Sequence, residues 1–169
     1  MVRRKWWWAG IALFGMACRT STAVEMAGEP APGIASNITV ISMQAAGGNV
    51  TSSAVVFDSA SGTYEEYQCA GSNPLSCPNA QRHTGSSDRI ALDAAFQLTG
   101  SAAFRSLRPS YGFPGDITPP DPRGVTIIVV ANGRRWSVSR DMRATYPEIL
   151  ARLDCRLELA RGALILCSQ

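Results

Sequence analysis

The chain is poor in the residues that most often carry catalysis or nucleic-acid binding. It has one histidine, His83, and one lysine, Lys5, and it lacks the Gly-x-Ser-x-Gly motif that presents the nucleophile of many hydrolases. Three of its 16 basic residues, Arg3, Arg4 and Lys5, stand at the N-terminus, so the 13 that follow balance the 13 acidic residues. This neutral remainder gives no support for nucleic acid as a partner, because such binding relies on an excess of basic side chains.

Long apolar runs are missing as well. The most apolar stretch, residues 6–17, would rise about 18 Å as a helix, which is short of the roughly 30 Å hydrocarbon core of a bilayer. It follows Arg3-Arg4-Lys5 and ends at the small residue Ala17, which is the order of the charged, apolar and cleavage regions in a bacterial export signal. We therefore expect residues 1–17 to be a signal peptide.

The end of this signal, Leu13-Phe14-Gly15-Met16-Ala17-Cys18, resembles the lipobox of bacterial lipoproteins, although Gly15 stands where an aliphatic residue is usual. The resemblance implies that Cys18 is lipidated and becomes the new N-terminus, which anchors the protein in a bilayer. Because Arg19 is not aspartate, it also implies the outer membrane. Two alternatives stay open: secretion to the periplasm or beyond after cleavage near Ala23 or Ala27, and an uncleaved anchor.

The remaining chain divides into a spacer and one domain. Residues 18–36 are rich in Ala, Ser, Gly and Pro and have few large apolar side chains, so we expect a flexible linker. Residues 37–169 are a usual length for a single globular domain with one core.

Four cysteines remain beside Cys18, and an exported protein meets oxidising conditions. Three pairings are possible; the short separations favour Cys69 with Cys77 and Cys155 with Cys167. The alternative of a zinc site lacks a Cys-x2-Cys motif and has only His83 to add. We expect two disulfides, no metal and no cofactor.

Alternating apolar residues predict an antiparallel meander over residues 37–43, 50–57 and 63–69, followed by a polar surface loop over residues 70–87 that the first disulfide closes. Helical spacing over residues 88–107, after a cap at Ser87 and with a break at Gly100, predicts two short helices or one kinked helix.

Asn132-Gly133 is the favoured two-residue turn, so residues 125–130 and 136–139 should form a hairpin. Thr145-Tyr146-Pro147-Glu148 matches a capping box at the start of a last helix. Residues 153–160 fit either a continued helix or a hairpin that turns at Arg161-Gly162, and we favour the hairpin because it places Cys155 opposite Cys167. The fold class is α+β, an antiparallel β-sheet with one or two helices packed on one face.

The candidates for chemistry are few. His83 with Ser86, Ser87 and Asp88 would suit a secreted hydrolase, but neighbours in a polar loop do not make a preorganised triad, so we expect no enzyme. Trp136 could join Arg134, Arg135, Arg140 and Arg143 in a recognition face, but we expect it in the core with the arginines solvated.

The proline-rich loop, residues 108–123, holds the better binding candidates. Tyr111 and Phe113 lie between prolines that stiffen the loop, and Asp116 and Asp121 flank the segment. Packing of the same aromatic side chains within the domain is the alternative. Asp116 and Asp121 could bind a cation, with ordinary turn and solubility roles as the alternative.

The order of elements is similar to that of emfourin-type domains, small bacterial inhibitors of thermolysin-like metalloproteases. The residues that carry the likeness are Gly47-Gly48, 104–107, Pro119-Pro120-Asp121, 125–139 and 147–153. They are turn and core positions, so the resemblance transfers no inhibitory residue. We expect a membrane-tethered envelope domain that binds another envelope or secreted protein, with inhibition of an extracellular metalloprotease as the alternative.

Overall fold

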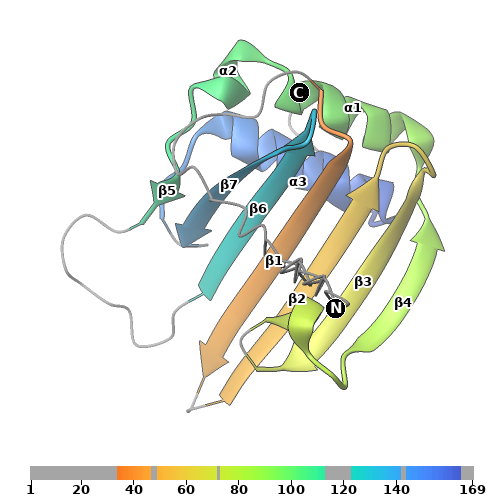
Figure 1. Ribbon diagram of the computed structural model, residues 1–169. Helices are drawn as coiled ribbons and strands as arrows, with labels where there is room; N and C mark the ends of the chain where they lie inside the picture. The colour runs from red at the N-terminus through yellow and green to blue at the C-terminus, as the bar shows by residue number, and fades with distance from the viewer. Residues whose placement is uncertain (1–33, 47–48, 72, 113–122, 142–143, 165–169) are drawn as a thin grey trace, which may run out of the picture.

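The computed structural model describes residues 34–46, 49–71, 73–112, 123–141 and 144–164, which form a mixed seven-stranded sheet with helices on one face (Figure 1). The strand order is β4-β3-β2-β1-β6-β7-β5, and every pairing is antiparallel except the short one between β5 and β7. The strands are β1 (Asn37–Ala46), β2 (Asn49–Asp58), β3 (Thr63–Ala70), β4 (Gln81–Ser86), β5 (Ser110–Tyr111), β6 (Arg123–Ala131) and β7 (Arg134–Asp141). The predicted α+β class is confirmed.

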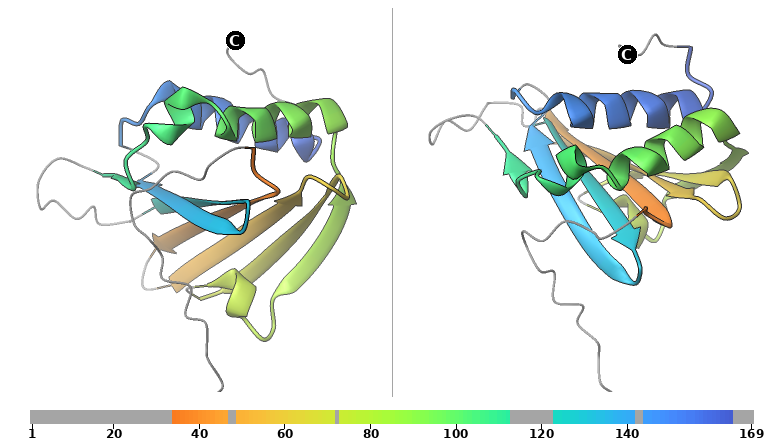
Figure 2. Two further views of the ribbon diagram at one scale, coloured as in Figure 1. Left: turned by 45° about the horizontal axis from the view of Figure 1, so that its top comes forward. Right: turned by 90° about the horizontal axis from the view of Figure 1, so that it is seen from above.

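Two long helices, α1 (Arg89–Thr99) and α3 (Glu148–Ala160), pack beside each other on the same face of the sheet (Figure 2). The shorter α2 (Ala102–Arg105) follows α1 after Gly100, as the predicted break requires, and a 3-10 turn, η1 (Pro74–Ser76), lies before β4. The N-cap of α1 is Asp88, not Ser87: its Oδ1 accepts a hydrogen bond from the Ala91 amide at 2.8 Å.

The core lies between the sheet and the helices α1 and α3. Because side chains alternate along a strand, every second residue of the central strands points into this core. Ile38, Phe57, Val129 and Trp136 stand on adjacent strands at paired positions and are almost fully buried. Leu92 and Phe96 of α1 and Leu150, Leu153 and Leu157 of α3 cover them.

The chain enters β1 through two hydrogen bonds that fix its start. The amide of Ala35 donates to Thr99 Oγ1 at the end of α1 (3.1 Å), and the amide of Ser36 donates to the carbonyl of Val130 on β6 (2.8 Å). Ala35 is buried, so residues just before β1 already belong to the folded unit. No helix among the described residues is long and apolar enough to cross a membrane.

The local predictions with strong turn or alternation signals are confirmed. The meander is β1, β2 and β3, and the hairpin of β6 and β7 turns at Asn132 and Gly133, which both have positive φ (50° and 74°) as a type I′ turn requires.

Other local predictions are wrong. Residues 70–87 are not all loop, because Gln81–Ser86 form the edge strand β4; its side chains are polar on both faces, so no alternation marks it. Residues 153–160 are not a hairpin: α3 continues through Cys155 to Ala160, and Leu153, Leu157 and Ala160 carry on the buried stripe begun at Ile149. The capping box is also absent, since Pro147 is the N-cap and makes no side-chain hydrogen bond.

One predicted disulfide is present among the described residues, Cys69 to Cys77, with 6.4 Å between the Cα atoms. It ties the end of β3 to the segment after η1. Cys155 is half-buried on α3 and is not a free thiol, but its predicted partner Cys167 lies outside the described residues. That pairing stays a prediction, as do the signal peptide of residues 1–17 and most of the linker of residues 18–36.

Candidate functional site: a polar groove beside α3

On the face of the sheet that lies toward the helices, the side chains change from apolar to polar along the strands. On β1, Ile38 and Val40 lie in or against the core, whereas Ser42 and Gln44, the next two residues on the same face, do not. The register repeats this change on the neighbouring strands, where Phe57 and Val55 give way to Ser53 on β2. The apolar half is covered by α1 and α3, and the polar half is not.

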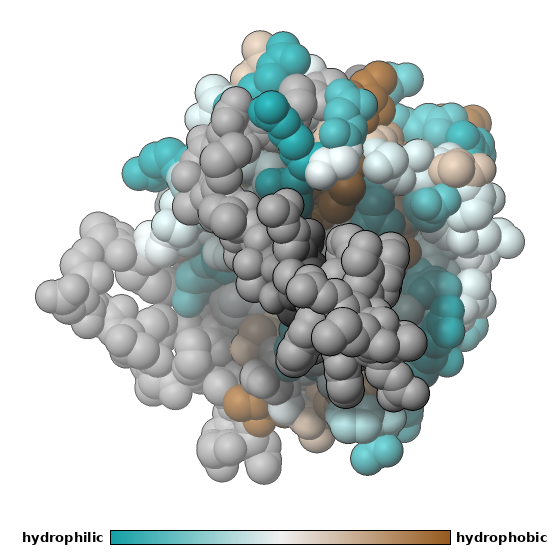
Figure 3. All heavy atoms as spheres, viewed as in Figure 1, coloured by the Kyte–Doolittle hydropathy of each residue, from teal (hydrophilic) through white to brown (hydrophobic). Residues whose placement is uncertain are grey.

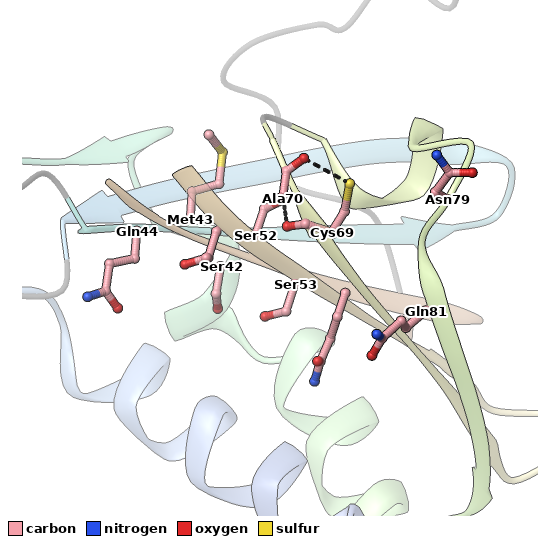
Figure 4. A pocket seen from close by; sticks show the side chains of 11 residues that line it. Ser42, Met43, Gln44, Ser52, Ser53, Cys69, Ala70, Asn79 and Gln81 are labelled. Atoms are coloured by element: carbon pink, nitrogen blue, oxygen red, sulfur yellow. Dashed lines mark hydrogen bonds between the residues drawn. The ribbon is translucent and has the colours of Figure 1, made fainter. Parts of the chain in front are cut away.

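The polar half holds a cavity of about 550 Å³. Ser42, Gln44, Ser53 and Gln81 reach into it from two central strands, β1 and β2, and from the edge strand β4, on the side of the sheet where the helices lie (Figure 4). We call the six lining residues that share this face and end in an amide or a hydroxyl the polar floor: Ser42, Gln44, Thr51, Ser53, Gln68 and Gln81.

Four members of the polar floor form one row across the strands. The register pairs Ser42 with Ser53, Ser53 with Gln68 and Gln68 with Gln81. In the other direction Ser42 pairs with Val125, and Val125 pairs with Arg140 on β7. The row therefore runs from Arg140 to Gln81 over six adjacent strands. Val125 and Arg140 are buried, so its open part is the four positions from Ser42 to Gln81, a span of about 14 Å at roughly 4.8 Å per strand.

Helix α3 forms one wall of the groove above this row. A second cavity of about 230 Å³ lies between α3 and the sheet, and it shares Ser42 and Ser53 with the first. Two ion pairs that join α3 to the sheet flank it, Arg140 with Asp154 and Arg161 with Glu66. Because β7 and β3 are four strands apart in the sheet, α3 crosses the strands in the same direction as the row.

The Arg140 to Asp154 pair closes the inner end. The Arg140 side chain is 8% exposed; its guanidinium donates to Asp154 and lies 4.2 Å from the centre of the Tyr146 ring. Burial raises the pKa of Asp154, and the charge of Arg140 opposes that rise. The Nε of Arg140 is buried and has no hydrogen-bond partner among the described residues, so no ligand in the groove reaches it.

The outer ion pair connects α3 to the polar floor. Arg161 donates to Glu66 Oε2 at 2.9 Å and to Glu158 at 3.2 Å, and Gln68 Nε2 donates to Glu66 Oε1 at 3.0 Å. The amide nitrogen of Gln68 is thus held toward the helix, and its carbonyl oxygen is left as an acceptor.

The groove continues to the exposed edge of the sheet. A third hollow of about 290 Å³ is lined by Glu66, Gln68, Gln81 and His83 among others. Beside it the Tyr64 ring lies against Gly85, where a Cβ would come within 2.5 Å of the ring carbon Cζ. Gly85 therefore allows the Tyr64 ring to lie over β4.

Most of the predicted binding residues lie outside the described part of the chain: Phe113, Asp116, Asp121 and the lipidation site Cys18. Tyr111 is described, and it is buried on β5 with its hydroxyl oxygen accepting from the Arg108 amide at 2.9 Å. This placement favours the alternative of an aromatic side chain packed within the domain.

Two other candidate groups are dispersed by the fold. His83 points to the groove side of β4, whereas Ser86, three residues on, points to the opposite face, and Asp88 caps α1. The predicted burial of Trp136 is confirmed, with Phe104 edge-on at 4.8 Å. The expectation that the arginines are solvated is wrong for Arg140, which is buried against Asp154.

The polar floor was not predicted from the sequence, although one signal for it is present there. In β1 the helix-side residues read Ile38, Val40, Ser42, Gln44, so the apolar series stops midway along a strand that goes on. Such a stop marks where the cover of a sheet ends. In the described residues no group of three or more His, Cys, Asp or Glu could hold a metal ion.

The surface of the described residues seen in Figure 3 is mostly hydrophilic or neutral, with apolar residues in small separate spots. No family model, no curated protein and no solved structure matches this chain.

Proposed function

We propose that this chain is an envelope lipoprotein, anchored through Cys18 in the outer membrane, whose domain binds another envelope or secreted protein in the polar groove. The observation that carries the binding role is the polar floor. Ser42, Ser53, Gln44 and Gln81 make no side-chain hydrogen bond with any described residue, and they line a cavity of about 550 Å³. Hydrogen-bonding groups left open in a hollow are suited to a polar ligand.

Binding without catalysis fits the chemistry of these groups. Amides and alcohols hydrogen-bond at any physiological pH but do not transfer protons easily, since catalytic acids and bases need a pKa near the working pH. The charged residues around the groove are held in ion pairs, Arg140 with Asp154 and Arg161 with Glu66. His83 lines only the hollow at the exposed edge, and the polar floor itself consists of amides and alcohols.

The anchor rests on the N-terminal sequence. Residues 1–17 have the order of an export signal, and Ala17-Cys18 resembles a lipoprotein cleavage site. The test is the intact mass of the protein extracted from membranes, before and after reduction. We expect a diacylglyceryl or triacyl adduct on a chain that begins at Cys18, and a gain of two hydrogens for each disulfide. An unmodified chain beginning near Val24 or Gly28 would replace the anchor with secretion.

The binding role is tested by photo-crosslinking in intact cells. A photoreactive side chain is introduced at His83 in one variant and at Thr84 in a second. Both residues are exposed and adjacent on β4, but they face opposite sides of the sheet. We expect a discrete protein adduct from position 83, and not from position 84. Adducts of equal yield from both positions, or from neither, would remove the groove as the binding site.

The inhibitor alternative makes a different demand. It depends on the proline-rich loop, so replacing residues 108–123 by a flexible linker should abolish any inhibition of an extracellular metalloprotease. Residues 113–122 lie outside the described part of the chain, and the described contact of Tyr111 is internal. The groove is therefore the better supported site.

A further inference from the structure

We propose that the groove holds an extended, uncharged peptide segment that runs across the strands beside α3 and is bound mainly through its main-chain amides. This inference rests on the proposed binding function and specifies its ligand. It is carried by the open part of the row, from Ser42 to Gln81, and by the hydrogen-bonding groups along it.

The hydrogen-bonding groups match a peptide backbone. A peptide group offers one N–H donor and one C=O acceptor, and a glutamine amide offers both in the same planar arrangement. Gln81 and Gln44 have both functions free, and Gln68, whose amide nitrogen donates to Glu66, presents its carbonyl oxygen.

The shape of the groove also suits an extended chain. Ser42 and Ser53 occupy the middle of the row, where short side chains let a main chain come close to the sheet. The open part of the row, from Ser42 to Gln81, spans about 14 Å, which corresponds to about four residues at roughly 3.4 Å per residue. The α3 wall runs in the same direction and gives the segment a second surface.

Other ligand classes fit less well. Small-molecule sites are lined mainly by apolar and aromatic side chains, whereas none of the described residues lining the 550 Å³ cavity is aromatic. Without aromatic side chains the cavity has no surface on which nucleic-acid bases could stack. None of the described residues that line it is Arg or Lys, so it does not favour a phosphate backbone either. A charged ligand group would meet either the neutral floor or arginines that already have carboxylate partners.

The test uses the full-length protein in detergent and a library of acetylated and amidated heptapeptides built from Ala, Ser, Thr, Val and Gln. Binding is followed by NMR through the side-chain amide signals of Gln44, Gln68 and Gln81, with Gln97 on the exposed side of α1 as the reference. Chito-oligosaccharide is the second probe. We expect the peptides to shift the three groove signals and leave Gln97 unchanged.

Variants then separate main-chain recognition from other contacts. Gln44→Met with Gln81→Met keeps the side-chain volume but removes both amides, and should weaken the best peptide at least tenfold, since each net hydrogen bond contributes roughly a factor of five to ten. Gln97→Met should have no effect. An ester in place of one amide of the peptide should weaken binding several-fold.

Three results would overturn the inference. In the first, the peptide still binds after Gln44→Met with Gln81→Met, which would indicate strand addition at the β4 edge. In the second, the NMR signals of the groove glutamines respond to the saccharide alone. In the third, these signals respond to neither probe. If position 83 still crosslinks a protein in cells, any of these removes the ligand class and leaves the proposed function standing. If position 83 gives no adduct, the function itself fails.

Discussion

The two halves of the helix-side face use the same strands for opposite purposes. In the covered half, Ile38, Phe57 and Trp136 are buried beneath α1 and α3, and apolar burial stabilises the fold. In the uncovered half, Ser42, Ser53 and the glutamines add little to stability and stay open to ligands. The residues that stabilise the domain and the residues proposed to bind a ligand therefore lie at opposite ends of the same strands. The same strand pairings fix the positions of both groups.

The largest effect is expected in the covered half. Trp136→Ala should lower the free energy of unfolding by about 3 to 5 kcal/mol, because it empties a large space against Phe104. Urea denaturation measures this. The control is Ile90→Ala on α1, where the side chain is 85% exposed and the change should stay within about 0.5 kcal/mol. Similar losses for the two variants would contradict the described core.

The boundary between the halves should be the next most sensitive place. Asp154→Ala leaves the buried guanidinium of Arg140 without its carboxylate, and should cost about 3 kcal/mol. Asp93→Ala removes the partner of Arg89 in a pair whose side chains are both at least half exposed, and should cost under about 0.5 kcal/mol. Equal costs would mean that the Arg140 pair is solvated.

The same boundary should respond to pH. Burial raises the pKa of Asp154 above its unfolded value, so the folded state binds this proton more tightly. Its contribution to stability should therefore be complete below the unfolded pKa and be lost as pH rises through the raised folded pKa. Hydrogen bonds donated by Ser61 lower the pKa of Asp58, and those donated by Tyr67 and Arg82 lower the pKa of Glu65. The contributions of both carboxylates to stability are lost as pH falls through their lowered folded pKa values. Measuring the free energy of unfolding of Asp154→Asn and of the parent chain between pH 4 and pH 7 should isolate the contribution of Asp154. If the two proteins show the same pH dependence, this contribution is absent.

At the far rim of the uncovered half, the disulfide should matter moderately. Replacing Cys69 and Cys77 by Ser frees a loop of about ten residues and should lower the free energy of unfolding by about 2.5 kcal/mol in the chain-entropy model. Thermal unfolding of the variant and the parent measures the difference. An unchanged midpoint would show that the segment after β3 is constrained by its other contacts.

The smallest effect on stability should accompany a complete loss of binding. Ser42→Val with Ser53→Val extends the apolar series of β1 and β2 into the groove, and should change the free energy of unfolding by under about 1 kcal/mol because valine suits a strand. Peptide binding should disappear as the row loses its centre. If binding persists, the two halves are not functionally distinct; the NMR titration described above decides this.

Local signals predicted much of this fold. Asn132-Gly133 placed the hairpin and alternation placed the meander, because turn chemistry and burial of one face act within a few residues. The edge strand β4 carries no such signal, since both of its faces are polar.

The groove was harder to predict because its parts come together only through register. Arg140, Ser42 and Gln81 lie far apart in sequence, and their common row depends on five separate strand pairings. The ion pair of Arg140 with Asp154 forms because α3 continues past Leu153. The expected placement of Cys155 opposite Cys167 had favoured a hairpin at this point. The stop in the apolar series after Val40 was the one local sign of where the cover ends.

The entry of the chain into β1 has a mechanical consequence for the tethered form. When the proposed anchor pulls against a ligand held by Ser53 on β2, the load passes through the Ala35 and Ser36 hydrogen bonds to β1 and then across its ladder to β2. β1 is flanked by β2 along its whole length and by β6 from Asn37 to Gln44. Force in this direction shears the ladder between β1 and β2 instead of opening it bond by bond, so many hydrogen bonds share the tension between the proposed anchor and the proposed ligand.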